Sequence, residues 1–253
     1  MSTVLLVIRV ALGFLYLGIT FWFNLLALLI LLPSRRARVR VTSLWAKSLA
    51  FVCVWLSGIE IQFSHRERLK RMPPAIYVSN HVSMLDVFLA MWILPIGTTA
   101  VAKKQIKWVP LFGVLYAMSG SLMLDRKKRT ASIAELQAQS KFLVKNGFSV
   151  AIWPEGTRSR DGRLLPFQKG FAHMALWTRL PIVPVVVSGA HKAWQIGGFR
   201  IQSDAKVHVE ICEPISTENW SRKRIDSHIE EVHRAFRERL PPDQQPESPV
   251  SVA

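Results

Sequence analysis

The sequence predicts an α/β fold: a mixed sheet of about seven strands flanked by helices, preceded by an N-terminal membrane-embedded two-helix motif. From residue 59 onward, short apolar or alternating runs are separated by longer segments of helical character, which is typical of an α/β domain. Residues 10–33 form an uncharged, mostly apolar run. With 253 residues and 50% hydrophobic content, the chain can form one catalytic domain with a sizeable core and a small accessory element.

The first section, residues 1–58, is predicted to anchor the chain to a membrane. A helix over residues 10–33 would be about 36 Å long, which exceeds the ~30 Å hydrocarbon thickness of a bilayer. A second apolar segment, residues 41–56, has Lys47 as its one charge and is short for an untilted span. Four arginines separate the segments, and the positive-inside tendency would keep them cytosolic: Arg35, Arg36, Arg38 and Arg40. Two arrangements fit, either one span plus an interfacial helix or a two-helix motif in a single leaflet.

The second section, residues 59–240, is predicted to be the α/β domain, and residues 241–253 a disordered, proline-rich tail. Strands are expected at residues 59–63, 75–79, 98–102, 121–124, 148–153, 182–188 and 206–212. Helices are expected between several of these strands and at the end, at residues 84–93, 130–145, 170–179 and 225–240.

The charge balance indicates an anionic partner. The formal net charge is +16, which suits nucleic acid, a membrane surface or phosphorylated small molecules. Basic residues concentrate between residues 34 and 71, next to the apolar segments, as expected for juxtamembrane charge attracted to lipid headgroups. Because this charge is intermingled with apolar runs and no nucleic-acid-binding motif is present, we expect membrane lipids and not nucleic acid as partners.

The most informative stretch is residues 80–86, Asn-His-Val-Ser-Met-Leu-Asp, which follows the strand-like run 75–79. On a continuous helix a five-residue offset rotates two side chains by roughly 140°, so His81 and Asp86 would not meet. At a strand-to-helix turn they can meet, and the Asp86 carboxylate can accept the His81 Nδ1–H and leave Nε2 free as a general base. The alternative is structural: Ser83 followed three residues later by Asp86 is close to a capping box. No second His or Cys follows at ligand spacing, so no metal site is predicted.

Three further blocks accompany this stretch, at residues 122–126, 153–159 and 183–187. In their order and separations, the four blocks resemble those of the glycerolipid acyltransferase family, most closely its bacterial 1-acyl-glycerol-3-phosphate acyltransferases of the PlsC-like type. The resemblance extends to residues 102–104, 108–113 and 165–170, and covers roughly residues 75–190. Trp153 and Met123 are mild departures, since the family often has Phe and Ile there.

Arg126 and Arg158 are the predicted phosphate ligands. Arg126 ends a strand-like run, and residues at the carboxyl ends of strands face the usual ligand crevice of an α/β sheet. A guanidinium binds phosphate bidentately, and the resemblance implies that Arg126 holds the glycerol phosphate headgroup. Arg158 would be a second phosphate clamp.

The neighbours of Arg158 and two lysines complete the predicted substrate site. Gly156 permits a close backbone approach or a positive φ, and Thr157 supplies a hydroxyl. Glu155 could accept a bond from a glycerol hydroxyl or hold Arg158 in place. Lys103 and Lys104 could add positive field for the phosphate or the coenzyme, or be ordinary surface lysines.

The resemblance implies an enzyme of phospholipid biosynthesis. Such an enzyme moves a fatty acyl group from acyl-CoA or acyl-carrier protein to the sn-2 hydroxyl of lysophosphatidic acid, giving phosphatidic acid without a cofactor or an acyl-enzyme. Its location would be the bacterial inner membrane, with the catalytic domain cytosolic and both N-terminal helices in one leaflet. The alternatives are another acceptor, namely a lyso-ornithine lipid or glycerol 3-phosphate, or a non-enzymatic, basic lipid-binding protein.

Overall fold

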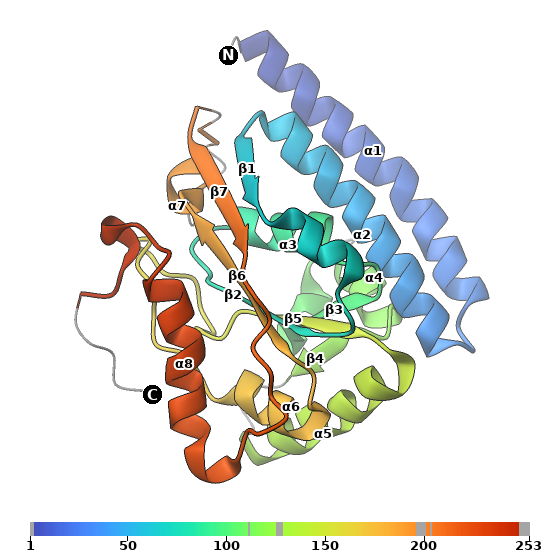
Figure 1. The fold of residues 1–253 in the computed structure, drawn as a ribbon. Helices are drawn as coiled ribbons and strands as arrows, with labels where there is room; N and C mark the ends of the chain where they lie inside the picture. Colours follow the sequence, from blue (N-terminus) through green and yellow to red (C-terminus); the bar gives the residue numbers. More distant parts are fainter. Residues whose placement is uncertain (1–2, 111, 125–128, 196–200, 203, 248–253) are drawn as a thin grey trace.

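The computed structural model describes residues 3–110, 112–124, 129–195, 201–202 and 204–247. A seven-stranded sheet crosses the molecule in the order β1-β7-β6-β2-β5-β3-β4 (Figure 1). The strands are β1 (Glu60–Ser64), β2 (Ile76–Ser79), β3 (Thr98–Lys103), β4 (Leu122–Leu124), β5 (Ser149–Ile152), β6 (Ile182–Ser188) and β7 (Lys206–Ile211). Neighbouring strands are parallel except β6 and β7, which confirms the predicted mixed sheet.

The α-helices are α1 (Thr3–Ile30), α2 (Arg35–Ser57), α3 (Leu85–Ile93), α4 (Phe112–Met118), α5 (Arg129–Asn146), α6 (Gly170–Thr178), α7 (Ala190–Ala193) and α8 (Ile225–Arg237). Short 3-10 helices are η1 (Arg66–Arg71), η2 (Lys104–Trp108), η3 (Arg222–Arg224) and η4 (Pro242–Gln244). Each predicted strand and helix of the α/β domain is present, with its ends shifted by a few residues at most.

Side-chain alternation along the strands gives the sheet an apolar core on each face. Ile76 and Val78 of β2 pack with residues of α5, α6 and α8, whereas Tyr77, between them, packs with α3 on the opposite face. Because both faces are covered, the central strands are mostly apolar, and all four residues of β2 are buried.

Helices α1 and α2 lie side by side along one flank of the molecule (Figure 1). By length and composition both could cross a membrane. The outward side of α1 is strongly apolar: Phe14, Trp22, Phe23 and Ile30 are 68–71% exposed. Such a continuous apolar surface is typical of a helix that contacts lipid.

The sequence places the four arginines between the two apolar segments. In the structure they belong to the first turns of α2, which begins at Arg35. Arg35 Nε donates to the carbonyl oxygen of Gly120 (3.0 Å), and Arg38 donates to that of Met118 (2.8 Å). The Arg35 guanidinium also stacks 3.7 Å over the Phe142 ring. Arg35 and Arg38 therefore attach α2 to the α/β domain by hydrogen bonds. The exposed Arg40 lies 5.9 Å over the Phe148 ring, and Arg36 is exposed.

Helix α2 is part of the catalytic domain's core, although the sequence suggests a boundary at residue 58. Val39 lies in the core on one face of the sheet and Val54 in the core on the other. By contrast, α1 contributes Phe21 and Leu28 to a separate cluster with α2 and α4. Helix α2 therefore packs both against α1 and against the α/β domain.

The predicted disordered tail from residue 241 is wrong for residues 241–247. Gln244 is 1% exposed, accepts a bond from the Gly189 backbone N–H (2.8 Å) and donates to the Gly162 carbonyl (3.2 Å). Its own carbonyl accepts from the Leu164 N–H (2.9 Å). Burial of a polar side chain with all these partners fixes the segment despite its polar composition. Residues 248–253 lie outside the described part.

Candidate active site

The site lies where β2, β5 and β6 end. These strands are parallel neighbours, so the loops that follow them meet at one edge of the sheet. The β2–α3 loop carries His81, the loop after β5 carries residues 153–159, and the loop after β6 leads into α7.

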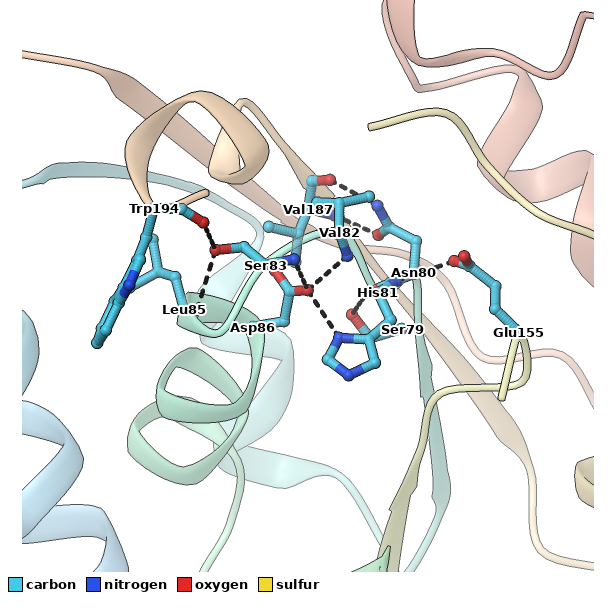
Figure 2. A network of polar contacts seen from close by, with 10 residues as sticks. All are labelled: Ser79, Asn80, His81, Val82, Ser83, Leu85, Asp86, Glu155, Val187 and Trp194. Carbon is cyan, nitrogen blue, oxygen red and sulfur yellow. Dashed lines mark hydrogen bonds and ion pairs between the residues drawn. The ribbon is translucent and has the colours of Figure 1, made fainter. Parts of the chain in front are cut away.

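His81 and Asp86 form the predicted pair. His81 Nδ1 lies 2.9 Å from Asp86 Oδ2, and the Asp86 side chain is fully buried whereas that of His81 is 17% exposed (Figure 2). A carboxylate is an acceptor only, so Nδ1 carries the proton and Nε2 presents its lone pair. This is the tautomer that a general base requires.

Asp86 also holds the loop that leads into α3, so a structural role and the orientation of His81 are not alternatives. Oδ2 accepts from the backbone N–H groups of Val82 (2.7 Å) and Ser83 (2.8 Å) as well as from His81. Ser83 Oγ accepts from the Leu85 N–H (3.1 Å) and donates to the Trp194 carbonyl (2.6 Å). One oxygen atom therefore both holds the loop before α3 and orients the imidazole.

Other loops brace the same stretch from both sides (Figure 2). The fully buried Asn80 side chain bonds both backbone groups of Val187, at 2.8 and 2.9 Å. Glu155 Oε1 accepts from the His81 N–H (2.8 Å), and the Ser159 N–H donates to the His81 carbonyl (2.8 Å). The backbone of His81 is therefore held at both of its polar groups by the loop after β5.

Glu155 lies in an unusual electrostatic environment. It is 5% exposed, and its burial raises the carboxyl pKa well above the usual range. The negative charge of Asp86 raises this pKa further, while the His81 and Leu165 backbone groups oppose the shift. The structure shows no contact between Glu155 and Arg158 among the interactions of the described residues.

The rest of the 153–159 loop is arranged for close approach. The Trp153 ring lies 5.2 Å from the His81 ring, and Gly156 adopts a φ of 73°, which a residue with a Cβ rarely adopts. Thr157 is exposed. Arg158 is half-buried and makes no hydrogen bond or ion pair with the described residues, so its guanidinium is available to an anion within that part of the chain.

The remaining predicted ligands lie further along the sheet. Lys103 ends β3, two strands from β2, and is exposed; Lys104 is exposed as well and pairs with Glu135 (3.7 Å). This pairing favours the surface-lysine interpretation for Lys104. Arg126 lies outside the described residues.

A small void of about 10 Å³, room for about one water molecule, lies between α3 and the sheet beside Asp86. The residues around it extend from Asp86 and Trp153 to Ile93 and Tyr77. They are mostly apolar, with Leu89 and Val185 among them, and they include the polar Ser79. The void therefore places apolar surface directly behind the polar site.

Sequence reasoning did not assign a role to Asn80 or Ser159, which hold the loop that carries His81. Asn80 had one signal, its place next to His81 at the end of a buried strand, where an amide is costly unless its bonds are satisfied. Ser159 acts through its backbone N–H. Every residue except proline has this group, so the residue type gives no signal of the role.

Known proteins match most of this chain. A family model described as "Acyltransferase" matches residues 60–188. A relative from Cocos nucifera, named 1-acyl-sn-glycerol-3-phosphate acyltransferase, is 40% identical over 97% of this chain and 79% of its own length. A relative of the same name from Haemophilus influenzae is 29% identical over 73% of this chain and 76% of its own.

A solved structure has the same fold. It is the crystal structure of the 1-acyl-sn-glycerophosphate acyltransferase PlsC from Thermotoga maritima, at a TM-score of 0.71 and 22% identity. The match covers 93% of this chain and 94% of the other, so it includes the N-terminal helices as well as the sheet.

Proposed function

The chain belongs to the acyltransferase family, and we propose that it acylates the sn-2 hydroxyl of 1-acyl-glycerol 3-phosphate (lysophosphatidic acid), giving phosphatidic acid for phospholipid biosynthesis. The observation that carries this proposal is the His81–Asp86 pair, at 2.9 Å, in a site lined by loops that match the family's blocks. The names of the relatives supply the acceptor.

His81 is the general base in the proposed reaction. Nε2 takes the proton of the sn-2 hydroxyl as the oxygen attacks the carbonyl carbon of the acyl thioester. When the carbon–sulfur bond breaks, the leaving thiolate takes that proton from Nε2, so His81 returns to its starting state. Asp86 keeps Nδ1 protonated and stabilises the imidazolium that exists between the two transfers.

The two substrates approach from different parts of the site. We propose that Arg158 and Arg126 bind the phosphate of the lysolipid, with Gly156 and Thr157 close to its headgroup and Lys103 contributing positive field. The fatty acyl chain of the donor packs against the apolar side chains beside Asp86, such as Leu89 and Val185. The donor is acyl-CoA or acyl-carrier protein, and the chemistry needs no metal or prosthetic group.

We propose that α1 and α2 lie in one leaflet. Helix α2 is attached to the domain near its start by Arg35 and Arg38 and near its end by Val54, so it cannot cross a bilayer while it remains packed. The apolar outer surface of α1 would then face the acyl chains of that leaflet. The net charge of +16 favours the anionic cytosolic face of a bacterial inner membrane.

An acceptor panel tests the proposal. The protein is reconstituted in vesicles with labelled acyl-CoA or acyl-carrier protein, and offered lysophosphatidic acid, a lyso-ornithine lipid or glycerol 3-phosphate. We expect labelled phosphatidic acid from lysophosphatidic acid at the highest kcat/KM. A higher kcat/KM with either other acceptor would reassign the substrate, and no product from any acceptor would favour a lipid-binding protein.

A further inference from the structure

Glu155 contacts the backbone of the catalytic base rather than any open part of the site. Its Oε1 lies 2.8 Å from the His81 N atom and accepts that N–H (Figure 2). The two residues are 74 positions apart in the chain and come from neighbouring parallel strands. At 5% exposure, the Glu155 side chain offers almost no surface to a substrate.

We propose that Glu155 is a positioning residue, which holds the main chain of His81 so that the imidazole reaches both Asp86 and the acceptor hydroxyl. This inference rests on the proposed function for the identity of the reaction. It differs from the expectation that Glu155 binds glycerol or orients Arg158.

The bonds around His81 form a closed frame. The imidazole is fixed by Asp86 on one side, and the peptide groups of His81 are fixed by Glu155 and by the Ser159 N–H. Asp86 alone leaves the ring free to move with the loop that carries both residues. Glu155 ties that loop to β5, and a displacement of the base by about an ångström can cost roughly a hundredfold in rate.

The second carboxyl oxygen of Glu155 indicates whether the neutral or the charged carboxyl group holds the His81 backbone. Oε2 is buried and has no well-aligned hydrogen-bond partner among the described residues. The Leu165 backbone group stabilises the charged form, but burial of a carboxylate is costly and outweighs it, whereas burial of a neutral carboxyl group costs far less. The raised pKa of Glu155, caused first by burial, favours the same neutral form.

Two conservative variants separate positioning from charge. In Glu155→Gln the amide oxygen can accept the His81 N–H at the same reach, and the charge is absent. In Glu155→Asp the charge can be present, but the carboxylate is one methylene too short to reach that N–H. A positioning role therefore ranks Gln above Asp, and a charge-dependent role in substrate binding ranks Asp above Gln.

The experiment measures kcat and KM for lysophosphatidic acid with the full-length protein in vesicles. We expect Glu155→Gln to keep kcat within about threefold, and Glu155→Asp to lose about a hundredfold in kcat with little change in KM. Glu210→Gln, on β7 and paired with Arg239, is a matched control and should keep wild-type kinetics.

Hydrogen exchange of residues 79–84, followed by mass spectrometry, tests the frame without any acyl acceptor. Protection should be retained in Glu155→Gln and reduced in Glu155→Asp. If the wild-type protein acylated no acceptor, the proposed function would fail while this measurement still decided on the frame. The positioning role is overturned by equal protection in both variants, by a loss confined to KM, or by Asp outperforming Gln.

Discussion

The loop at residues 80–86 and helix α1 differ in how far their groups find partners within the protein. In the loop, the N–H groups of His81, Val82 and Ser83 all donate to the carboxyl groups of Glu155 and Asp86. In α1, by contrast, large apolar side chains are exposed along most of the helix. The three N–H groups of the loop are satisfied within the fold, whereas the apolar outer surface of α1 is buried only if an apolar phase outside the protein covers it.

This difference separates two kinds of effect. Changes in the loop should act on the rate of the chemical step, because they move or remove the base. Changes in α1 should act on access to a substrate that resides in a bilayer, because they alter how the domain meets the membrane.

The largest effect is expected at the catalytic pair. His81→Ala should lower kcat by at least about 10²–10⁴-fold with little change in thermal stability, since it removes the base but no cap. Asp86→Ala should lower kcat comparably and also destabilise the fold by about 1–3 kcal/mol for each N–H left unpaired. The measurements are kcat and thermal melting by circular dichroism, and equal melting temperatures of the two variants would refute the shared role of Asp86 Oδ2.

A smaller effect is expected at the phosphate clamp. Arg158→Ala should remove a charge-assisted contact of about 1.5–3 kcal/mol, so kcat/KM for lysophosphatidic acid should fall roughly 10- to 100-fold. Arg158→Lys should recover only part of this loss because it lacks the bidentate fork, and Arg126→Ala should behave like Arg158→Ala. The donor's KM serves as the internal control; if it rose equally, these arginines would belong to the donor site or to the general architecture.

Removal of α1 with retention of α2 should lower activity on a substrate that is presented in a bilayer. We expect most of the activity on vesicle-borne lysophosphatidic acid to be lost, and activity on detergent-dispersed substrate to persist. The comparison to make is the ratio of the two rates in the truncated and full-length proteins. Removal of residues 1–58 should instead unfold the domain, because Val39 and Val54 would be lost from its cores. An unchanged ratio would contradict substrate delivery by α1.

The smallest effect on rate is expected where the start of α2 contacts the α/β domain. Arg35→Ala removes the bond to the Gly120 carbonyl and the contact with the Phe142 ring. It should lower the free energy of unfolding by about 1–3 kcal/mol and leave the kcat of the folded fraction near that of the wild type. Urea unfolding gives the first quantity, and a large fall in kcat would show that α2 influences the catalytic loop directly.

Much of the α/β domain follows from local patterns. The alternation of Ile76, Tyr77 and Val78 predicts a strand buried on both faces, and the structure has one at Ile76–Ser79. The His81–Asp86 pair could be predicted as well, because a strand-to-helix turn brings together side chains five residues apart. Neither inference needs knowledge of distant parts of the chain.

By itself, the sequence determined the order of strands and helices, the apolar N-terminal segments and the pairing of His81 with Asp86, since each depends on residues close together in the chain. The tertiary structure decided that Glu155 holds His81, that α2 belongs to the core and that Gln244 is buried against Gly162 and Gly189. These contacts join residues far apart in sequence, and they depend on the strand order β6-β2-β5 and on how helices pack over it. The period of the hydrophobic pattern determines which face of a helix or strand is buried. Which residues contact that face depends on how the whole chain packs.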